Sequence, residues 1–153
     1  MDPANFVDEW IDAAELEKFR KNYEDQVRRG IPSAIAVFSY AHALIKSSKE
    51  DVKTGIFLLE GLLKRDSEDV PKRDYVYYLS VAHTRLKEYD RALDYIGILL
   101  AAESDNRQAL ELKQLIEKRM KRDGFLGLAV LGLGGSVALA AGVIAAGVLS
   151  RRH

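Results

Sequence analysis

The segment RDYVYYLSVAHTRLKEYDRALDYIGILL (residues 73–100) determines the fold, because an earlier segment repeats its pattern. AVFSYAHALIKSSKEDVKTGIFLLEGLL (residues 36–63) matches it at a constant offset of 37 residues, without a gap. The equivalent pairs are Tyr40 and Tyr77, Ala43 and Ser80, Leu44 and Val81, Val52 and Tyr89, Gly55 and Ala92, Ile56 and Leu93, Leu59 and Ile96, Leu62 and Leu99, and Leu63 and Leu100. The small residues predict close approach of two antiparallel helices, and the aliphatic residues fill the space around them. The repeat therefore predicts two copies of one helical hairpin.

Around these hairpins, apolar residues recur three or four positions apart, which is typical of amphipathic helices. The stretches predict an all-α bundle of six helices, over residues 12–30, 32–47, 48–64, 72–87, 90–103 and 106–122. We expect Asp12 with Glu15, Ser48 with Asp51, and Ser104 or Asp105 to cap the first, third and last of them. The first helix presents one apolar face, formed by Leu16, Phe19, Tyr23 and Val27.

Two helical hairpins in tandem, with small residues at each crossing, resemble tetratricopeptide repeats, although the usual period is 34 residues. Such repeats stack into a superhelix whose first helices line a concave groove, and the terminal helices act as caps. This geometry predicts a groove lined by Val37, Tyr40, Leu44, Asp74, Tyr77, Val81, Thr84 and Arg85. Tyrosine and aliphatic residues there favour an apolar peptide over an acidic chain terminus, which lysine and arginine would bind. The alternative is that these residues are ordinary helix surface and core.

The C-terminal segment contains no charged residue from Gly124 to Ser150. About 20 apolar residues cross the ~30 Å hydrocarbon core of a bilayer, so residues 124–150 predict one transmembrane helix. Two other interpretations of this segment are less favoured. A glycolipid-anchor signal would require a secretory signal and a polar spacer of small residues before the segment. A buried core helix would require a larger domain to enclose it. Small residues recur every four positions, at Gly134, Ala138, Gly142 and Ala146. These residues either allow helices to pack against one another in the membrane or only moderate the hydrophobicity of the segment.

Basic residues flank this predicted span, with Lys118, Arg119, Lys121 and Arg122 before it and Arg151 and Arg152 after it. The bias predicts that the N-terminal part is cytosolic, and that Lys121, Arg122, Arg151 and Arg152 act in targeting. The acidic N-terminus has no apolar core, which argues against a secretory signal. We therefore divide the chain into an N-terminal arm (1–11), a helical domain (12–123), a transmembrane helix (124–150) and a basic tail (151–153).

Composition narrows the function further. Arg151 and Arg152 account for two of the 23 basic residues, so residues 1–123 carry two more acidic than basic residues. This charge balance gives no indication of the strongly basic surface that nucleic-acid-binding proteins have. The chain has no cysteine, and no two of its histidines have the spacing of zinc ligands. Its clustered glycines, Gly132–Gly135, fall inside the apolar tail and do not form a phosphate-binding loop. We expect no enzymatic activity, no cofactor and no metal site.

Four stretches together resemble the mitochondrial fission 1 protein family: residues 38–47, 55–60, 73–95 and 121–127. The resemblance extends from Leu16 into the tail. It implies a tail-anchored receptor on the outer mitochondrial membrane, and also on peroxisomes, whose cytosolic helices recruit a dynamin-related GTPase directly or through adaptor proteins. The family's groove residues correspond to Leu44, Tyr78 and Arg85. His42 replaces the tryptophan usual in the family, which should alter packing between the first repeat's helices.

The arm contains an apolar set, Phe6, Val7, Trp10 and Ile11, on a segment too short for a core of its own. The resemblance implies a flap that controls partner access, and the alternative is that Trp10 packs against the first helix. Two further functions stay open beside recruitment. The protein could form a membrane-structural homo-oligomer through its tail, or it could serve as an import or quality-control receptor.

Overall fold

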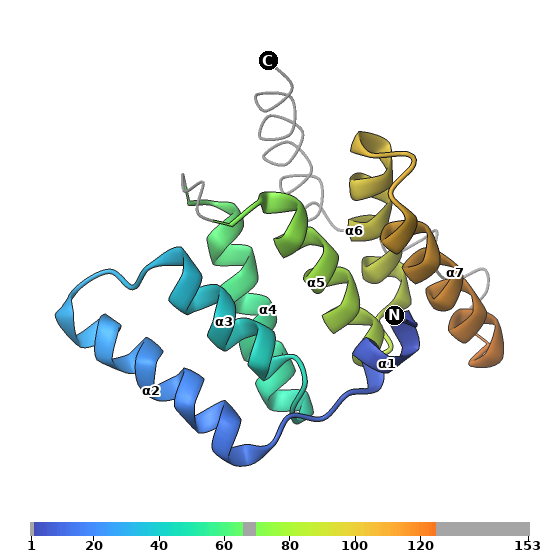
Figure 1. Cartoon of the computed structure of the whole chain (residues 1–153). Helices are drawn as coiled ribbons and strands as arrows, with labels where there is room; N and C mark the ends of the chain where they lie inside the picture. The colour runs from blue at the N-terminus through green and yellow to red at the C-terminus, as the bar shows by residue number, and fades with distance from the viewer. Residues whose placement is uncertain (1, 66–69, 125–153) are drawn as a thin grey trace.

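The computed structural model describes residues 2–65 and 70–124, and all regular secondary structure in this part is α-helical (Figure 1). The helices are α1 (Pro3–Asp8), α2 (Ala13–Arg29), α3 (Ala34–Leu44), α4 (Lys49–Leu63), α5 (Lys72–Arg85), α6 (Tyr89–Ala102) and α7 (Arg107–Arg122). The six predicted helices correspond to α2 through α7. The short helix α1 was not predicted; the Asp2 side chain caps it and Pro3 opens it.

The predicted helix starts are confirmed in part. Ser48 caps α4 by accepting a hydrogen bond from the Asp51 amide at 3.3 Å. Asp12 is the N-cap residue of α2, but its side chain makes no capping hydrogen bond. The prediction of Ser104 or Asp105 for α7 was wrong, since Asn106 accepts from the Ala109 amide at 3.1 Å. Asparagine in an extended conformation is among the best N-cap residues, so the helix starts there.

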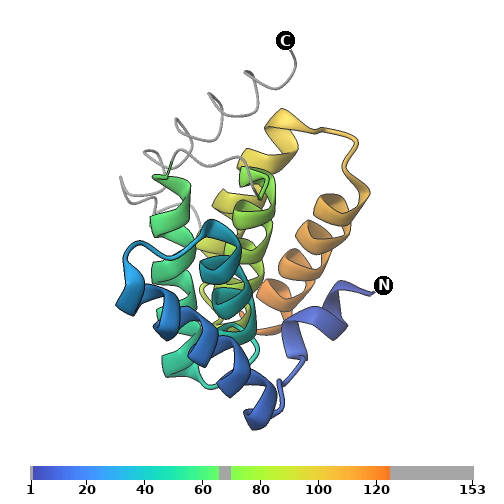
Figure 2. The same cartoon turned by 60° about the vertical axis from the view of Figure 1, so that its left-hand side comes forward.

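Consecutive helices from α2 to α7 pack pairwise as antiparallel hairpins (Figures 1 and 2). A Cβ atom added to Gly55 in α4 would lie 2.8 Å from Ile45 Cγ2 and 3.1 Å from the Ala41 carbonyl oxygen, so only glycine fits. In the second hairpin the Ser80 hydroxyl donates to the carbonyl oxygen of Ala92 at 2.8 Å. The close approach predicted at these small residues is therefore confirmed in both repeats.

One hydrophobic core runs through the hairpins and includes the fully buried Leu59, Leu79, Ile96 and Leu112. A second cluster joins α2 to α3 through four residues, Leu16, Tyr40, Ala43 and Leu44. The outer end of the predicted apolar face of α2 stays open, because Val27 is 45% exposed. The helix α2 thus packs on the first repeat through residues from Leu16 to Tyr23.

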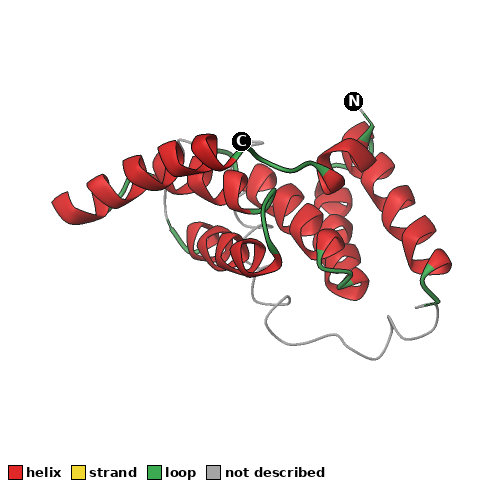
Figure 3. Ribbon diagram, turned by 90° about the horizontal axis from the view of Figure 1, so that it is seen from below, coloured by secondary structure: helices red, strands yellow, loops and turns green. Residues whose placement is uncertain are grey.

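The helix α1 packs against α5 and α7, and a short linker of four residues connects it to α2 (Figures 2 and 3). Its residue Val7 belongs to the main core and is 1% exposed. Burying a valine side chain contributes about 1.5 to 3 kcal/mol, which helps to hold so short a helix in place. The arm is therefore part of the folded domain.

No helix within residues 2–65 and 70–124 has the length and apolar character needed to cross a bilayer. The predicted transmembrane helix lies beyond Gly124, outside the described residues. Its small residues Gly134, Ala138, Gly142 and Ala146 and the targeting residues Arg151 and Arg152 lie there too. The transmembrane helix, its small-residue stripe and the targeting role of the two terminal arginines therefore stay predictions.

Candidate partner-binding surface

Two cavities meet on one face of α5, where they share the side chains of Asp74 and Tyr78. The first, which we call the aromatic pocket, has a volume of about 290 Å³ and is lined by Phe19, Phe38, Ser39, His42, Asp74 and Tyr78. The second, which we call the arm cavity, measures about 270 Å³ and is lined by Phe6, Arg73, Asp74, Tyr77, Tyr78, Leu99, Asn106 and Gln108. A surface bound by α2, α3, α5 and α7 thus offers two adjacent hollows.

The arm covers only one side of this surface. Phe6 of α1 contributes to the arm cavity, whereas no arm residue lines the aromatic pocket. A third cavity, of about 250 Å³, lies under the end of the arm between Val7, Trp10 and Arg85. The arm therefore contributes to the arm cavity and to the third cavity but not to the aromatic pocket.

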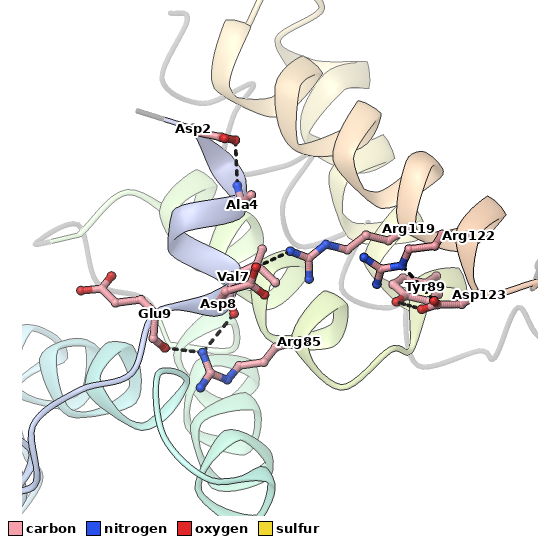
Figure 4. Close-up of polar contacts among 10 residues, drawn as sticks. All are labelled: Asp2, Ala4, Val7, Asp8, Glu9, Arg85, Tyr89, Arg119, Arg122 and Asp123. Carbon is pink, nitrogen blue, oxygen red and sulfur yellow. Dashed lines mark hydrogen bonds and ion pairs between the residues drawn. The ribbon is translucent and has the colours of Figure 1, made fainter.

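Arg85, at the end of α5, holds the arm through its backbone (Figure 4). Its Nη1 donates to the Val7 carbonyl oxygen at 3.0 Å and also to the Glu9 carbonyl oxygen, and Nη2 donates to the Ser47 carbonyl oxygen at 3.2 Å. Partial burial lowers the pKa of this guanidinium, an effect that the nearby carboxylates of Asp8 and Glu9 oppose. The planar guanidinium of arginine directs several N–H donors to these three carbonyl oxygens, and the single ammonium group of a lysine could not make the same set of hydrogen bonds.

Acidic residues of the arm face basic residues of the helices. Asp8 accepts a hydrogen bond from Arg119 Nη2 at 2.7 Å, and Glu9 lies 3.8 Å from Lys46 Nζ (Figure 4 shows the first pair). The Ile11 amide donates to the Lys46 carbonyl oxygen at 2.9 Å. Each exposed pair contributes little alone, so the arm depends on the sum of these contacts and on the burial of Val7.

Trp10 does not pack into a core, because 69% of its side chain is exposed. Its ring instead lies under the Arg85 guanidinium, whose Cζ atom is 4.7 Å from the ring centroid. This distance is within the range of a cation–π contact. The interpretation of Trp10 as a residue packed against the helix of residues 12–30 was therefore wrong, and its contact is with α5.

Three residues of the predicted groove floor are buried in the structure, with 8% of Tyr40, 1% of Leu44 and 3% of Val81 exposed. The Tyr40 ring stacks on Tyr23 with centroids 4.9 Å apart, and its hydroxyl accepts from Arg20 Nε at 3.3 Å. The reason is that α2 packs directly on this side of α3. Tyr40 and Leu44 thus face α2, and Val81 belongs to the main core.

Val37 and Thr84, also predicted for the groove, are buried as well and line none of the three cavities. Four of the predicted residues do line the cavities. Asp74 and Tyr78 lie between both hollows, Tyr77 lines the arm cavity, and Arg85 lies beneath the arm. The sequence prediction omitted Phe38, Phe19 and Ser39 as binding residues. Phe38 and His42 are four positions apart, as are Asp74 and Tyr78, so helical spacing alone places each pair on one face. That signal was present in the sequence, but it does not show which face stays open.

The aromatic pocket is built from rings in edge contact. The His42 and Tyr78 rings are perpendicular, at 84°, with centroids 4.7 Å apart, and Phe38 lies 5.8 Å from Tyr78 and 6.0 Å from His42. Burial lowers the pKa of His42 to about 4, with a further contribution from Lys46 that Glu9 opposes. The imidazole is therefore neutral at pH 7. Burial also raises the pKa of Tyr78, and the Asp74 carboxylate adds to this effect.

His83, the other histidine of the repeats, is buried between helices. It is 2% exposed, its ring stacks on Tyr95 at 5.5 Å, and its Nδ1 lies 3.2 Å from Glu88 Oε1. Burial lowers its pKa, and the hydrogen bond to Glu88 opposes that shift. Within the described residues, no three histidine or acidic side chains come together as a metal site.

Comparison with known proteins places this fold among relatives. The model of the Fis1 N-terminal tetratricopeptide repeat matches residues 36–66, and that of the Fis1 C-terminal tetratricopeptide repeat matches residues 73–125. FIS1-related protein fis-2 of Caenorhabditis elegans is 48% identical over 153 residues, covering 99% of this chain and 100% of the relative. The human mitochondrial fission 1 protein is 42% identical over 127 residues, covering 82% of this chain and 83% of the relative.

Solved structures agree with the sequence comparison. Fis1 from Saccharomyces cerevisiae superimposes with a TM-score of 0.69 at 26% identity, covering 78% of this chain and 92% of the yeast chain. Yeast Fis1 in complex with an Mdv1 fragment, which contains an N-terminal extension and coiled coil domains, gives a TM-score of 0.69 at 27% identity. That match covers 77% of this chain and 91% of the yeast chain. Two repeats, an arm-covered helical surface and these matches together lead to one conclusion: the chain belongs to the Fis1 family of mitochondrial fission proteins.

Proposed function

We propose that this protein is a membrane-anchored adaptor that recruits dynamin-related fission machinery, directly or through adaptor proteins, with the surface around Asp74 and Tyr78. The observation that carries this proposal is the pair of adjacent cavities on α5, in a chain with no predicted catalytic site. The Mdv1 fragment in complex with yeast Fis1 supports it, because the same fold there binds a segment with coiled coil domains. Apolar rings with a few polar groups suit the capture of such a segment.

The arm regulates this surface in our proposal. The arm cavity and the cavity under Trp10 both include arm residues, so a partner that uses them competes with α1. The contacts from Arg85, Arg119 and Lys46 set the free energy that such a partner must overcome. The open aromatic pocket needs no such displacement.

Location follows from the tail in this proposal. Residues 124–150 would anchor the protein by a single span in the outer mitochondrial membrane, with the helical domain in the cytosol, and peroxisomes would be a second destination. The basic residues Lys121, Arg122, Arg151 and Arg152 would direct targeting. Names of the relatives support mitochondria as the site of action.

The binding surface is tested with Ser39→Arg, which places a long side chain in the aromatic pocket without removing core contacts. Full-length protein in detergent is mixed with a coiled-coil fragment of a candidate adaptor, and copurification is measured. We expect Ser39→Arg to abolish binding while the helical circular dichroism stays unchanged. The same variant should fail to restore fission in cells that lack their own family member, although it reaches the same membrane.

The matched control is Phe57→Arg on α4, since Phe57 is 74% exposed and lines none of the three cavities described. It should bind and restore fission like the wild type. Normal binding by Ser39→Arg would place the interface elsewhere and reject the proposed surface.

Exchange of residues 124–153 for an unrelated tail anchor tests the membrane-structural alternative. Normal fission with the foreign tail would exclude a specific role for the stripe formed by Gly134, Ala138, Gly142 and Ala146. Loss of fission at an unchanged location would instead favour a homo-oligomer that acts through the membrane helix.

A further inference from the structure

The helix α1 ends in three consecutive residues whose side chains occupy three different places. Phe6 lines the arm cavity, and Val7 is 1% exposed in the main core. The Asp8 carboxylate accepts a hydrogen bond from Arg119 Nη2 at 2.7 Å (Figure 4). Successive residues of an α-helix are about 100° apart, so a helix packed against α5 and α7 can use all three side chains. One short stretch of sequence therefore supplies three kinds of contact.

We propose that a partner segment takes the place of α1 by presenting the same three groups in succession: a large apolar residue, an aliphatic residue and a carboxylate. The inference rests on the proposed function and specifies what the partner carries. The place in question, which we call the α1 site, is formed by Val52, Arg85 and Leu86 beside Val7, and by Arg119 of α7.

Arg119 explains why the segment must be acidic. Only 13% of its side chain is exposed while Asp8 is bound. Water can solvate the guanidinium when α1 leaves, but a partner that covers the site excludes this water again. Such a partner leaves a buried charge without a counter-charge unless it supplies a carboxylate, and an unpaired buried charge is strongly unfavourable. The partner therefore has to replace Asp8 with an acidic residue of its own.

The other two anchors of α1 impose further requirements. Removal of Val7 empties a place in the main core, which an aliphatic side chain of similar size fills best. Arg85 Nη1 donates to the carbonyl oxygens of Val7 and Glu9, and any segment with the same backbone path offers such acceptors. Arg85 thus selects the path of the segment, whereas the places of Val7 and Asp8 select its side chains.

The charges on the two sides of the α1 site agree with an acidic occupant. The helices contribute Lys46, Arg85 and Arg119, and the arm contributes Asp8 and Glu9. Glu9 Oε1 lies 3.8 Å from Lys46 Nζ. A basic segment would meet three like charges here, whereas an acidic segment is attracted.

The experiment uses the full chain in detergent micelles with Val7→Asp, a change that expels the arm because a carboxylate is not stable in the core. The probes are two acetylated, dye-labelled peptides with the sequence of residues 2–11, one unchanged and one carrying Asp8→Asn. Fluorescence anisotropy measures their affinities. We expect the unchanged peptide to bind about threefold to thirtyfold more tightly, since only this peptide offers Arg119 a carboxylate. Equal affinities, or no binding of either peptide, would overturn the proposal.

A change at Arg119 tests whether this residue causes the discrimination. When the chain also carries Arg119→Gln, the two peptides should bind equally, because the ion pair that distinguishes them is absent. The matched control is Arg122→Gln, since Arg122 lies on the same helix, is 63% exposed and pairs with Asp123. This control should keep the full difference between the peptides. Discrimination that survives Arg119→Gln would overturn the proposal.

A second pair of variants decides the question if Val7→Asp does not fold. Asp8→Asn and Arg119→Gln each remove the same ion pair from an otherwise unchanged chain, so both loosen the arm to a similar degree. Only Asp8→Asn keeps the guanidinium for an incoming carboxylate. The unchanged peptide should therefore bind about threefold to thirtyfold more tightly to Asp8→Asn than to Arg119→Gln. Equal binding to the two variants would reject the acidic segment.

The outcomes separate this inference from the proposed function, because the peptides report on the α1 site without any fission partner. An adaptor fragment that binds equally well to the Asp8→Asn and Arg119→Gln chains would retain recruitment and reject the acidic segment. Discrimination between the peptides by a chain that binds no adaptor fragment would support the α1 site and reject recruitment.

Discussion

Arg85 Nη1 donates a hydrogen bond to the carbonyl oxygen of Val7 at 3.0 Å, although the two residues are 78 positions apart. This contact joins the end of α5 to the arm and lies beside the buried Val7 side chain. The arm is therefore held by a donor that belongs to the repeats. In the proposed regulation, the strength of this contact sets how readily the arm leaves the arm cavity.

Replacement of Arg85 by lysine should release the arm. Lysine keeps the charge but cannot supply the planar fork that reaches Val7, Glu9 and Ser47. Loss of one or two charge-assisted hydrogen bonds costs about 1.5 to 3 kcal/mol each, so the open fraction should rise at least tenfold. Trp10 is the only tryptophan of the chain, and its fluorescence anisotropy should fall. Arg107→Lys, at an exposed position, should leave the anisotropy unchanged.

Leu44→Asp should unfold the helical domain instead of only weakening partner binding. The side chain is 1% exposed and belongs to the cluster that joins α2 to α3. An unpaired carboxylate there costs several kcal/mol, which is a large part of the stability of a small domain. Circular dichroism should show loss of helix. A well-folded Leu44→Asp variant with normal melting would contradict the buried position of Leu44.

Lys87→Gly should stabilise the protein by up to about 1 kcal/mol. Lys87 follows α5 with φ of 61°, and the Glu88 amide donates to the His83 carbonyl oxygen at 2.9 Å, as in a Schellman cap. Glycine adopts this conformation without the steric cost of a side chain. Urea denaturation checks the change. Lys113→Gly within α7 is the opposite control, since it should destabilise by about 1 kcal/mol.

His42 should make the protein less stable in mild acid. Its pKa of about 4 in the folded state lies below the unfolded value of 6.5, so the unfolded chain binds the proton first as the pH falls. Between pH 7 and pH 4.5 this should remove about 2 kcal/mol of the free energy of unfolding. Comparison of urea denaturation for the wild type and His42→Phe at both pH values isolates the contribution. An equal loss in the two proteins would show that His42 titrates normally.

Much of the architecture could be predicted from local pattern. Gly55 and Ser80 marked the helix crossings because close packing restricts side-chain size there, and the structure confirms both contacts. The face of α3 was harder to predict. Tyr40 was predicted to line the groove, but α2 packs on that side of α3 and buries it, whereas His42 lines the aromatic pocket.

The sequence by itself determined the order of the helices and their pairing, because helix periodicity, caps and small residues at crossings act between positions close in the chain. Tertiary structure decided where α1 lies and which side chains reach the cavities. Those outcomes depend on contacts such as Arg85 with Val7 and Arg119 with Asp8, 111 positions apart. A one-dimensional pattern marks a face as apolar, but which part of that face is covered depends on which distant segment packs against it.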